Sequence, residues 1–301
     1  MGGAGIDADE VLRIELIGKG IRNLSELECA DIVSLASRYA LWLPVDTYTR
    51  APWLAPYAIR KLRHRTDERA PGPKRDLWGM PDEQGYFADD NSLIKGVVRN
   101  LGVSPPHGPY SESRIGKGLV CCHVWPATTS DPLLFSFVPN LVWLPKSLAP
   151  YSDAHLAGPP HEVHEVLKAT SVLRYRSTPP EVGRARAGTA WARLAGATAE
   201  GSTDSYEFVP GKRIVSLVER RVQKMTEFLE ATLDETVPLP GRFSKRYHAG
   251  VGRRIDHTVW PAQEAVTASA RRQLLSELRS CVERSTGPRR SIAGAQSDRC
   301  V

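Results

Sequence analysis

Three side chains within the segment 118–153 have the chemistry needed to hydrolyse a phosphodiester bond: His123, Asn140 and Asp153. The imidazole of a histidine titrates near neutral pH, so His123 can take a proton from water. The amide of Asn140 can orient a neighbouring group, and the carboxylate of Asp153 can bind a hard divalent cation. We therefore expect this segment to support metal-assisted hydrolysis, with His123 as the general base.

The elements that must position these side chains follow from two short apolar runs and a proline. Residues 119–122 are typical of a strand, and His123 stands at its end. Residues 140–144 predict a second short strand, which begins at the asparagine. Pro145 has the fixed φ and the missing N–H that suit the first turn of a helix, so a helix is expected over 146–152.

This order of strand, loop, strand and helix resembles the HNH, or ββα-metal, nuclease family. In that family a histidine ends the first strand, an asparagine opens the second, and the last metal ligand lies on the following helix. His123 and Asn140 match the first two positions, and the sequences CHVWP and NLVWLP are similar to HNH domains of bacterial restriction-type endonucleases. The resemblance covers 118–153, and 78–175 with its looser surroundings. It implies an α+β fold, mainly helical, with a small ββα-metal (HNH) nuclease core.

Two positions depart from the family pattern. The residue before the histidine is Asp or His in the family and helps to bind metal, whereas this chain has Cys122, a softer ligand that suits Mg²⁺ poorly. The third catalytic position of the family falls on Ala149, which cannot bind a metal. Asp153 lies one helical turn later on the same face, so we expect it to be the replacement ligand, with His155 as the alternative. The expected cofactor is a divalent metal, Mg²⁺ or Mn²⁺.

The balance of charge favours a polyanionic partner, and double-stranded DNA is the partner expected. The net charge is +6 and the isoelectric point is near 9.1. Residues 1–50 hold more acidic than basic side chains, so the positive excess lies in the rest of the chain. Phosphate contacts supply most of the sequence-independent affinity for DNA. Five basic residues are the expected phosphate contacts: Lys95, Arg114, Lys117, Arg174 and Arg176.

Three other patterns do not complete the motifs that they suggest. The glycines beside Lys117 lack the GxxxxGK[ST] spacing of a nucleotide-binding loop, which argues against an ATPase. Asp89 and Asp90 lack the ExK strand of a PD-(D/E)xK nuclease. His161 and His164 in HEVHE do not have the HExxH spacing of a zinc protease. We expect these two histidines at the solvated start of a helix.

The composition is that of a folded globular protein, with 41% hydrophobic and 25% charged residues. No apolar run approaches the ~20 residues that span a bilayer. The first residues also lack the basic-then-apolar order of a signal peptide. We therefore expect a cytoplasmic protein without a membrane partner. The five cysteines form no CxxC pair, which argues against a structural zinc ribbon.

The pattern along the chain predicts four regions and a homodimer. Ser25 and Glu28 have the spacing of a capping box and predict a helix start. Symmetric cutting of duplex DNA calls for two active sites, which a two-fold dimer provides. The expected regions are an N-terminal helical region over 1–76, the nuclease core over 77–178, a helical C-terminal region over 179–285, and a disordered tail over 286–301.

Together these features predict a metal-dependent, sequence-specific DNA endonuclease of the restriction type. In this hypothesis Asn140 either orients His123 or pins the loop of the β-hairpin. The two departures from the family pattern favour an alternative, a DNA-binding or regulatory protein on a degenerate HNH scaffold. A third hypothesis is a metal hydrolase of small substrates that uses His161 and His164.

Overall fold

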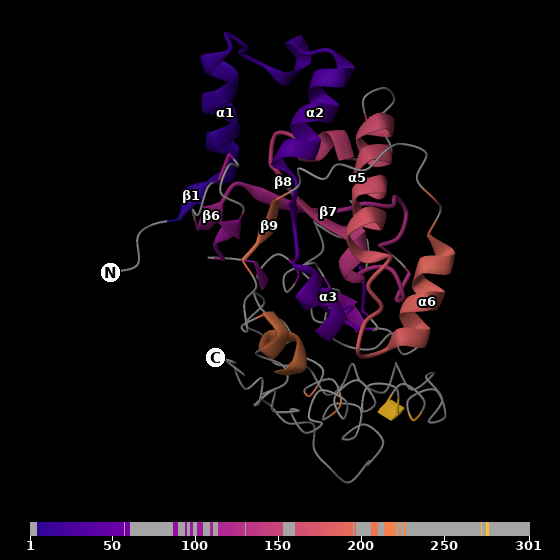
Figure 1. The fold of residues 1–301 in the computed structure, drawn as a ribbon. Coiled ribbons are helices and arrows are strands. Elements are labelled where there is room, and N and C mark those ends of the chain that lie inside the picture. Colours follow the sequence, from indigo (N-terminus) through magenta and orange to yellow (C-terminus); the bar gives the residue numbers. More distant parts are fainter. Residues whose placement is uncertain are drawn as a thin grey trace, which may run out of the picture.

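A computed structural model describes the parts of the chain on which the following account rests. The described residues are 5–56, 58–60, 87–89, 101–104, 109–110, 114–129, 131–152, 160–194, 206–209 and 214–220, together with isolated positions elsewhere. The protein is a mixed α+β fold in which helices pack around a central sheet (Figure 1).

The central sheet joins segments that are far apart in the sequence. Its order is β5-β9-β2-β8-β7, and β2 and β9 are parallel whereas the other neighbours are antiparallel. The strands are β5 (Val103–Ser104), β9 (Tyr206–Phe208), β2 (Leu41–Trp42), β8 (Leu141–Pro145) and β7 (Leu119–His123). The N-terminal region over 1–76, which was expected to be helical, thus also contributes β2 to the same sheet as the predicted nuclease strands.

The β7–β8 hairpin confirms the two predicted strands within one residue. The ladder runs from Leu119 opposite Pro145 to His123 opposite Leu141. All residues of β8 are buried, which explains its uninterrupted apolar sequence. Asn140 lies just before β8, as the last residue of the 3₁₀ turn η3 (Val138–Asn140). His123 therefore stands at the end of β7 that faces the long connection to β8.

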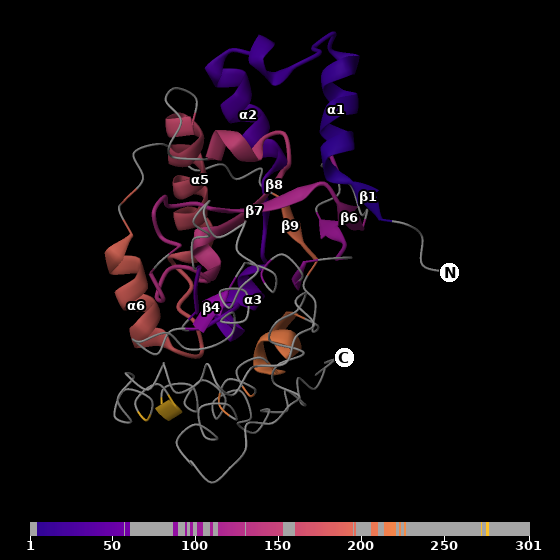
Figure 2. The ribbon, with the colours of Figure 1, turned by 180° about the vertical axis from the view of Figure 1, so that it is seen from behind.

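Helices cover the sheet and form the outer parts of the molecule. Figures 1 and 2 show α5 beside the β7–β8 hairpin, α6 outside it, and α1 and α2 projecting together from one end. The helices are α1 (Ala8–Gly18), α2 (Cys29–Tyr39), α3 (Val45–Arg50), α5 (Pro160–Tyr175) and α6 (Arg184–Arg193). The remaining elements are β1 (Ile6–Asp7), β3 (Ala58–Arg60), β4 (Phe87–Asp89), β6 (Ile115–Lys117), η1 (Leu24–Glu26) and η4 (Ala149–Ser152).

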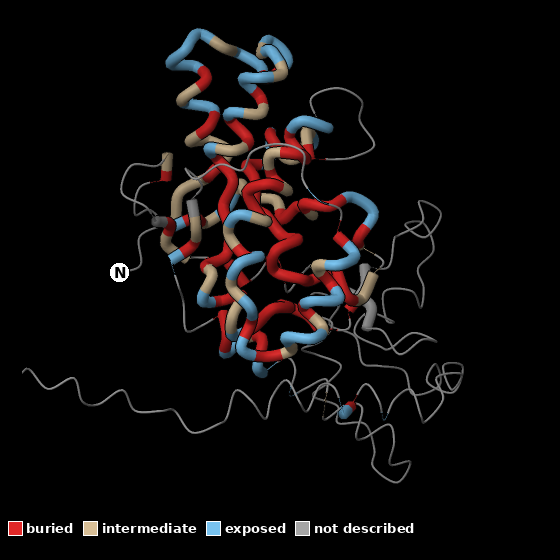
Figure 3. Tube along the Cα trace, turned by 45° about the vertical axis from the view of Figure 1, so that its right-hand side comes forward, coloured by how far each residue is buried: buried red, intermediate tan, exposed pale blue. Residues whose placement is uncertain are grey.

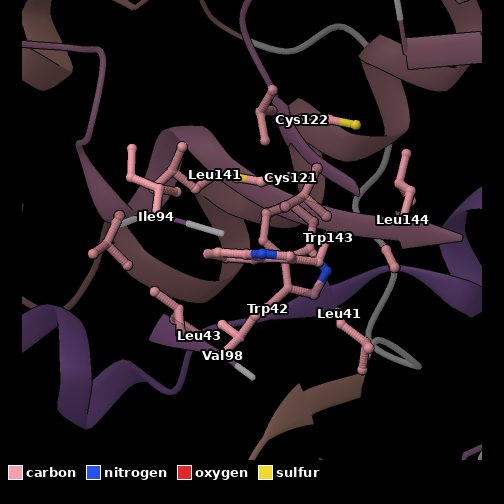
Figure 4. Packing of buried hydrophobic residues seen from close by; sticks show 14 of the residues in the cluster. Leu41, Trp42, Leu43, Ile94, Val98, Cys121, Cys122, Leu141, Trp143 and Leu144 are labelled. Atoms are coloured by element: carbon pink, nitrogen blue, oxygen red, sulfur yellow. The ribbon is translucent and has the colours of Figure 1, made fainter. Parts of the chain in front are cut away.

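One hydrophobic cluster runs through the molecule, and it lies between the sheet and the helices. Figure 3 shows the buried residues gathered there and the exposed ones at the connection between α1 and α2. Trp42 and Trp143 are the largest buried side chains at the centre of the sheet, where Leu41, Cys121 and Leu141 surround them (Figure 4). Burial of such large apolar side chains is the main stabilising term of a fold of this kind.

The helix expected over 146–152 is not an α-helix, and that prediction was wrong. Pro145 belongs to β8, and the chain then forms the single 3₁₀ turn η4. The backbone N–H of Leu148 donates to Pro145 at 3.0 Å and that of Tyr151 donates to Leu148 at 3.0 Å, which are bonds of 3₁₀ spacing. Pro150 has no N–H to donate and so stops an α-helix from continuing. Among the described residues, the next α-helix along the chain is α5.

The predicted capping box at Ser25 and Glu28 is also wrong. Asn23 caps the turn η1, because its side-chain oxygen accepts from the N–H of Ser25 at 3.1 Å. Glu28 is the residue before α2, and its side chain makes no capping hydrogen bond. Asparagine is as good a cap as serine, and its position two residues earlier shifts the start of the turn.

Several features predicted from the sequence lie outside the described residues. Among them are the tail 286–301 and the basic residue Lys95. Residues 214–220 are helical, in agreement with the helical pattern expected there. In the part of the chain that the structure covers, no helix is both long and apolar enough to cross a membrane.

A carboxylate joins α1 to α2. Glu15 accepts hydrogen bonds from Lys19 at 2.9 Å, from Arg38 at 2.8 Å and from the hydroxyl of Tyr39. Burial alone would raise the pKa of Glu15, but the bonds from Lys19 and Tyr39 and the charge of Arg38 outweigh it. The pKa of this carboxyl therefore lies below its ordinary value of 4.5.

Replacement of Glu15 by Gln should lower stability at neutral pH and remove part of the acid sensitivity. Because the folded-state pKa is lowered, the interaction stabilises the protein above the unfolded-state pKa and is lost as pH falls through the folded-state value. We expect a loss of about 1–2 kcal/mol at pH 7 that shrinks in acid. Urea unfolding at pH 7 and pH 3.5 measures it, with Glu28→Gln as the exposed control. An equal loss at both pH values would contradict the interpretation.

Replacement of Gly118 by Ala should strain the junction of α1 with the start of β7. Gly118 has φ +83°, and a Cβ there would collide with the carboxylate of Asp7 and lie 2.7 Å from the backbone nitrogen of Asp9. We expect a loss of more than about 1 kcal/mol. Gly188, within α6, has nothing within 4 Å of the equivalent position, so Gly188→Ala should instead gain about 0.5–1 kcal/mol. Thermal unfolding of the two variants should shift in opposite directions.

Candidate active site around His123

The backbone of the loop between β7 and β8 holds the ring of His123. Its Nε2 lies 2.8 Å from the carbonyl oxygen of Phe135, and the two rings stack with centroids 5.7 Å apart. A carbonyl oxygen only accepts, so Nε2 carries the hydrogen and donates. The neutral ring then has its lone pair on Nδ1. His123 is half-buried, which suits a group that must meet both a fixed partner and a reactant.

Asn140 pins that loop from inside. It is completely buried, and its side-chain oxygen accepts from the backbone N–H of Trp125 at 2.9 Å. Its amide donates to the hydroxyl of Thr128 at 2.8 Å and to the carbonyl of Leu134 at 2.9 Å. Of the two roles expected for Asn140, the geometry gives loop pinning. Orientation of His123 follows indirectly, because the carbonyl that holds the ring belongs to the residue after Leu134.

Helix α6 supports the same loop from outside. Arg193 donates to the carboxylate of Asp131 at 3.0 Å, and Arg186 donates to the carbonyl of Pro132 at 3.4 Å. The guanidinium of Arg186 also lies over the ring of Trp53, 5.0 Å from its centroid. The sequence did not single out these two arginines. They lie well apart from the predicted core in the sequence, and nothing in their local pattern indicates what they contact.

An aromatic cluster fills the space between α6, α3 and the loop. Trp191 meets Trp125 and Phe137 edge to face, with centroids 6.2 Å and 5.6 Å apart. Its indole N–H donates to the hydroxyl of Tyr48 at 3.1 Å. Burial raises the pKa of that tyrosine, against the opposing effect of the bond from Trp191, so its hydroxyl stays protonated at neutral pH. The cluster makes the base of the loop rigid.

His164 lies beside the end of β7, a position that was not predicted from the sequence. Its Nδ1 donates to the carbonyl of Val124 at 2.9 Å, and the residue is 4% exposed. The prediction that the histidines of HEVHE lie at a solvated helix start is confirmed for His161, which is exposed. It is wrong for His164, which is buried. One signal in the sequence could have indicated that His164 is buried. His164, Leu167 and Ser171 have the spacing of one helical face, and Leu167 and Ser171 are buried.

The predicted metal ligands are not brought together among the described residues. Asp153 and His155 lie outside these residues. Cys122 is buried opposite Val142, and neighbouring side chains of a strand point to opposite faces, so Cys122 faces away from His123. Wherever the structure describes the chain, no three His, Cys, Asp or Glu side chains form a possible metal site.

The predicted phosphate contacts at Arg114 and Lys117 are distant from His123. Both precede Gly118, at the start of β7, and the strand from Leu119 to His123 spans about 13 Å. Arg114 is exposed, and Lys117 forms an ion pair with Asp7 at 3.4 Å. Arg114 and Lys117 therefore lie toward the opposite end of β7 from His123.

Arg174 and Arg176 lie at the far end of α5. Ten helical residues separate Arg174 from His164, which corresponds to about 15 Å along the axis. Arg174 forms an ion pair with Glu207 of β9, and its side chain is 14% exposed. Arg176 is exposed just after the helix. Arg174 thus joins α5 to the sheet, and Arg176 is the one of this pair that faces solvent.

Comparison with protein-family models, with curated proteins and with solved structures gives no match. The resemblance to HNH nucleases accordingly depends on the sequence of 118–153 alone.

Replacement of Asn140 by Ala should destabilise the whole protein. The change leaves the buried N–H of Trp125 and the carbonyl of Leu134 without their partner, at a cost of about 2–4 kcal/mol. Arg193→Ala is the control, because it removes a solvent-exposed ion pair of the same loop worth at most about 1 kcal/mol. Chemical unfolding of the two variants measures the difference. Equal midpoints would show that Asn140 does not hold the loop.

Proposed function

We propose that this protein is a metal-dependent, sequence-specific DNA endonuclease of the restriction type, with an HNH-like site at the end of the β7–β8 hairpin. One observation carries the proposal. His123 stands at the end of β7, held through Nε2 by a backbone carbonyl of a loop that a buried asparagine pins. A rigidly held, half-buried imidazole at a strand end is suited to general base catalysis.

In the proposed reaction, Nδ1 of His123 takes a proton from a water molecule as the water oxygen attacks phosphorus. A phosphorus–oxygen bond on the far side breaks, and the 3′ oxygen leaves. The hydrogen bond that Nε2 donates to the carbonyl of Phe135 keeps the ring from turning, and it stabilises the imidazolium that forms because a carbonyl accepts more strongly from a charged donor. His164 acts as a positioning residue, since it fixes the backbone of Val124 next to the base.

The proposal includes a divalent metal, Mg²⁺ or Mn²⁺, held by Asp153 with His155 as the alternative ligand. When bound, such an ion stabilises negative charge on the phosphate and on the leaving oxygen. Cys122 is the least suited of the three predicted ligands, because it is buried and faces away from His123. We also infer that double-stranded DNA is the partner, and the net charge of +6 supports this inference. A cytoplasmic location is part of the same proposal.

A DNA-binding or regulatory protein that does not cut is the second candidate. The burial of Cys122 favours it, as does the lack of a possible metal cluster within the described ranges. The pinned loop would then be a structural remnant, and exposed cations outside the loop, such as Arg114 and Arg176, would contact phosphates. Cleavage assays separate the two candidates.

The protein should cut DNA in a metal-dependent manner, and His123→Ala should slow cleavage by about 100-fold or more. The purified chain is incubated with unmodified and with methylated plasmid or phage DNA, in Mg²⁺, Mn²⁺ or EDTA, and the products are separated on a gel. His161→Ala is the matched control, because His161 is an exposed histidine of α5.

Cleavage by His123→Ala at the rate of the unchanged protein would refute the mechanism. Retarded but intact DNA under every condition would favour the second candidate. Equal loss of cleavage in His161→Ala would show that the assay reports damage to α5 rather than the chemistry of His123.

A further inference from the structure

The carbonyl of Phe135 is one of four successive carbonyls in the loop between β7 and β8 that accept hydrogen bonds from different parts of the chain. The donors, in order from residue 133 to residue 136, are Trp53 at 2.8 Å, Asn140 at 2.9 Å, His123 at 2.8 Å and Leu54 at 3.0 Å. All four residues that accept are buried. Water therefore does not readily replace a donor that is lost.

Ser136 shares a peptide group with the carbonyl that accepts from His123. A peptide group is planar, so the direction of the Phe135 carbonyl depends on where the backbone of Ser136 lies. The hydroxyl of Ser136 donates to the carbonyl of Ala55 at 2.7 Å and accepts from the N–H of Ala55 at 3.0 Å. One hydroxyl can make both bonds, because it has one hydrogen and two lone pairs. Ser136 and Ala55 are both completely buried.

The backbone around Ser136 also pairs antiparallel with the segment 52–55. The N–H of Leu54 donates to the carbonyl of Ser136 at 3.0 Å, and the N–H of Val138 donates to the carbonyl of Pro52 at 2.8 Å. Ser136 is thus held by its backbone and by its side chain. This segment comes long before β7 in the sequence, so the pairing fixes the loop to a separate part of the core.

We propose that Ser136 is a positioning residue that orients His123 through the carbonyl of Phe135. Its hydroxyl anchors the shared peptide group to Ala55, and this keeps the carbonyl within reach of Nε2 of His123. Without the hydroxyl, the N–H of Ala55 loses its buried acceptor and the peptide group can rotate. The inference rests on the proposed function only for the role of His123 as the general base.

The hydrogen on Nε2 of His123 tests this orientation directly. In the full chain with nitrogen-15 in its histidines, this hydrogen should give an NMR signal, because the bond to Phe135 protects it from exchange with water. His123→Gln identifies the signal by removing it. Ser136→Ala should raise the exchange rate by about 10-fold or more, the ratio expected for the loss of one hydrogen bond, and should slow DNA cleavage by a similar factor.

Thr170→Val is the matched control. It removes a buried hydroxyl whose bond stays within α5, where it donates to the carbonyl of Val166 at 2.7 Å. This change should lower stability but leave the signal of His123 and the cleavage rate as they are. Ser136→Cys keeps a weaker donor and acceptor in the same place, so it carries the test if Ser136→Ala does not fold, and its exchange rate should also rise.

Three results would overturn the inference: a signal of His123 that is not protected in the unchanged protein, an unchanged exchange rate in a folded Ser136 variant, or an equal rise in Thr170→Val. The nuclease proposal can fail separately. If the unchanged protein cuts no DNA while Ser136→Ala loses the protection, His123 is not the base of a nuclease, and Ser136 still orients its ring.

Discussion

The orientation of His123 depends on the hydrogen bonds of one buried amide, that of Asn140. Three partners along the loop between β7 and β8 bind it, so the loop adopts one conformation. The carbonyl of Phe135 then meets the imidazole at a fixed place. A buried amide with every partner satisfied is stable, and the loss of any one partner leaves a desolvated polar group. The same hydrogen bonds therefore determine both the conformation of the loop and the orientation of His123.

The sheet depends on this hairpin in turn, because every residue of β8 is buried. On one side β8 pairs with β7, which bears the histidine, and on the other with β2, which is joined to β9. Helix α5 is attached to the same unit through His164 and through Ser171, whose hydroxyl donates to the carbonyl of Pro139 at 2.5 Å. The candidate site is thus part of the hydrophobic core and is not an appendage on a surface loop.

The sequence predicted the hairpin well because its information is local. The apolar runs and the proline that ends β8 are visible in short windows, and the strand that ends at His123 is confirmed. The sheet beyond β8 could not be predicted, since β2 and β9 are strands of two or three residues with no periodic pattern, and their pairing joins distant segments. The burial of His164 and the contacts of Arg186 and Arg193 could not be predicted either. They follow from how α5 and α6 pack, which a single sequence does not reveal.

The support of the loop by α6 sets an order of events during synthesis. The loop between β7 and β8 is immobilised by hydrogen bonds from Trp53, from Asn140 and from α6, which ends at Arg193. A nascent chain on the ribosome exposes the histidine long before α6 has emerged. Until then the imidazole belongs to a loop that is held only from inside. Any activity of this site therefore belongs to a chain that has been made at least as far as the end of α6, and unfinished fragments lack it.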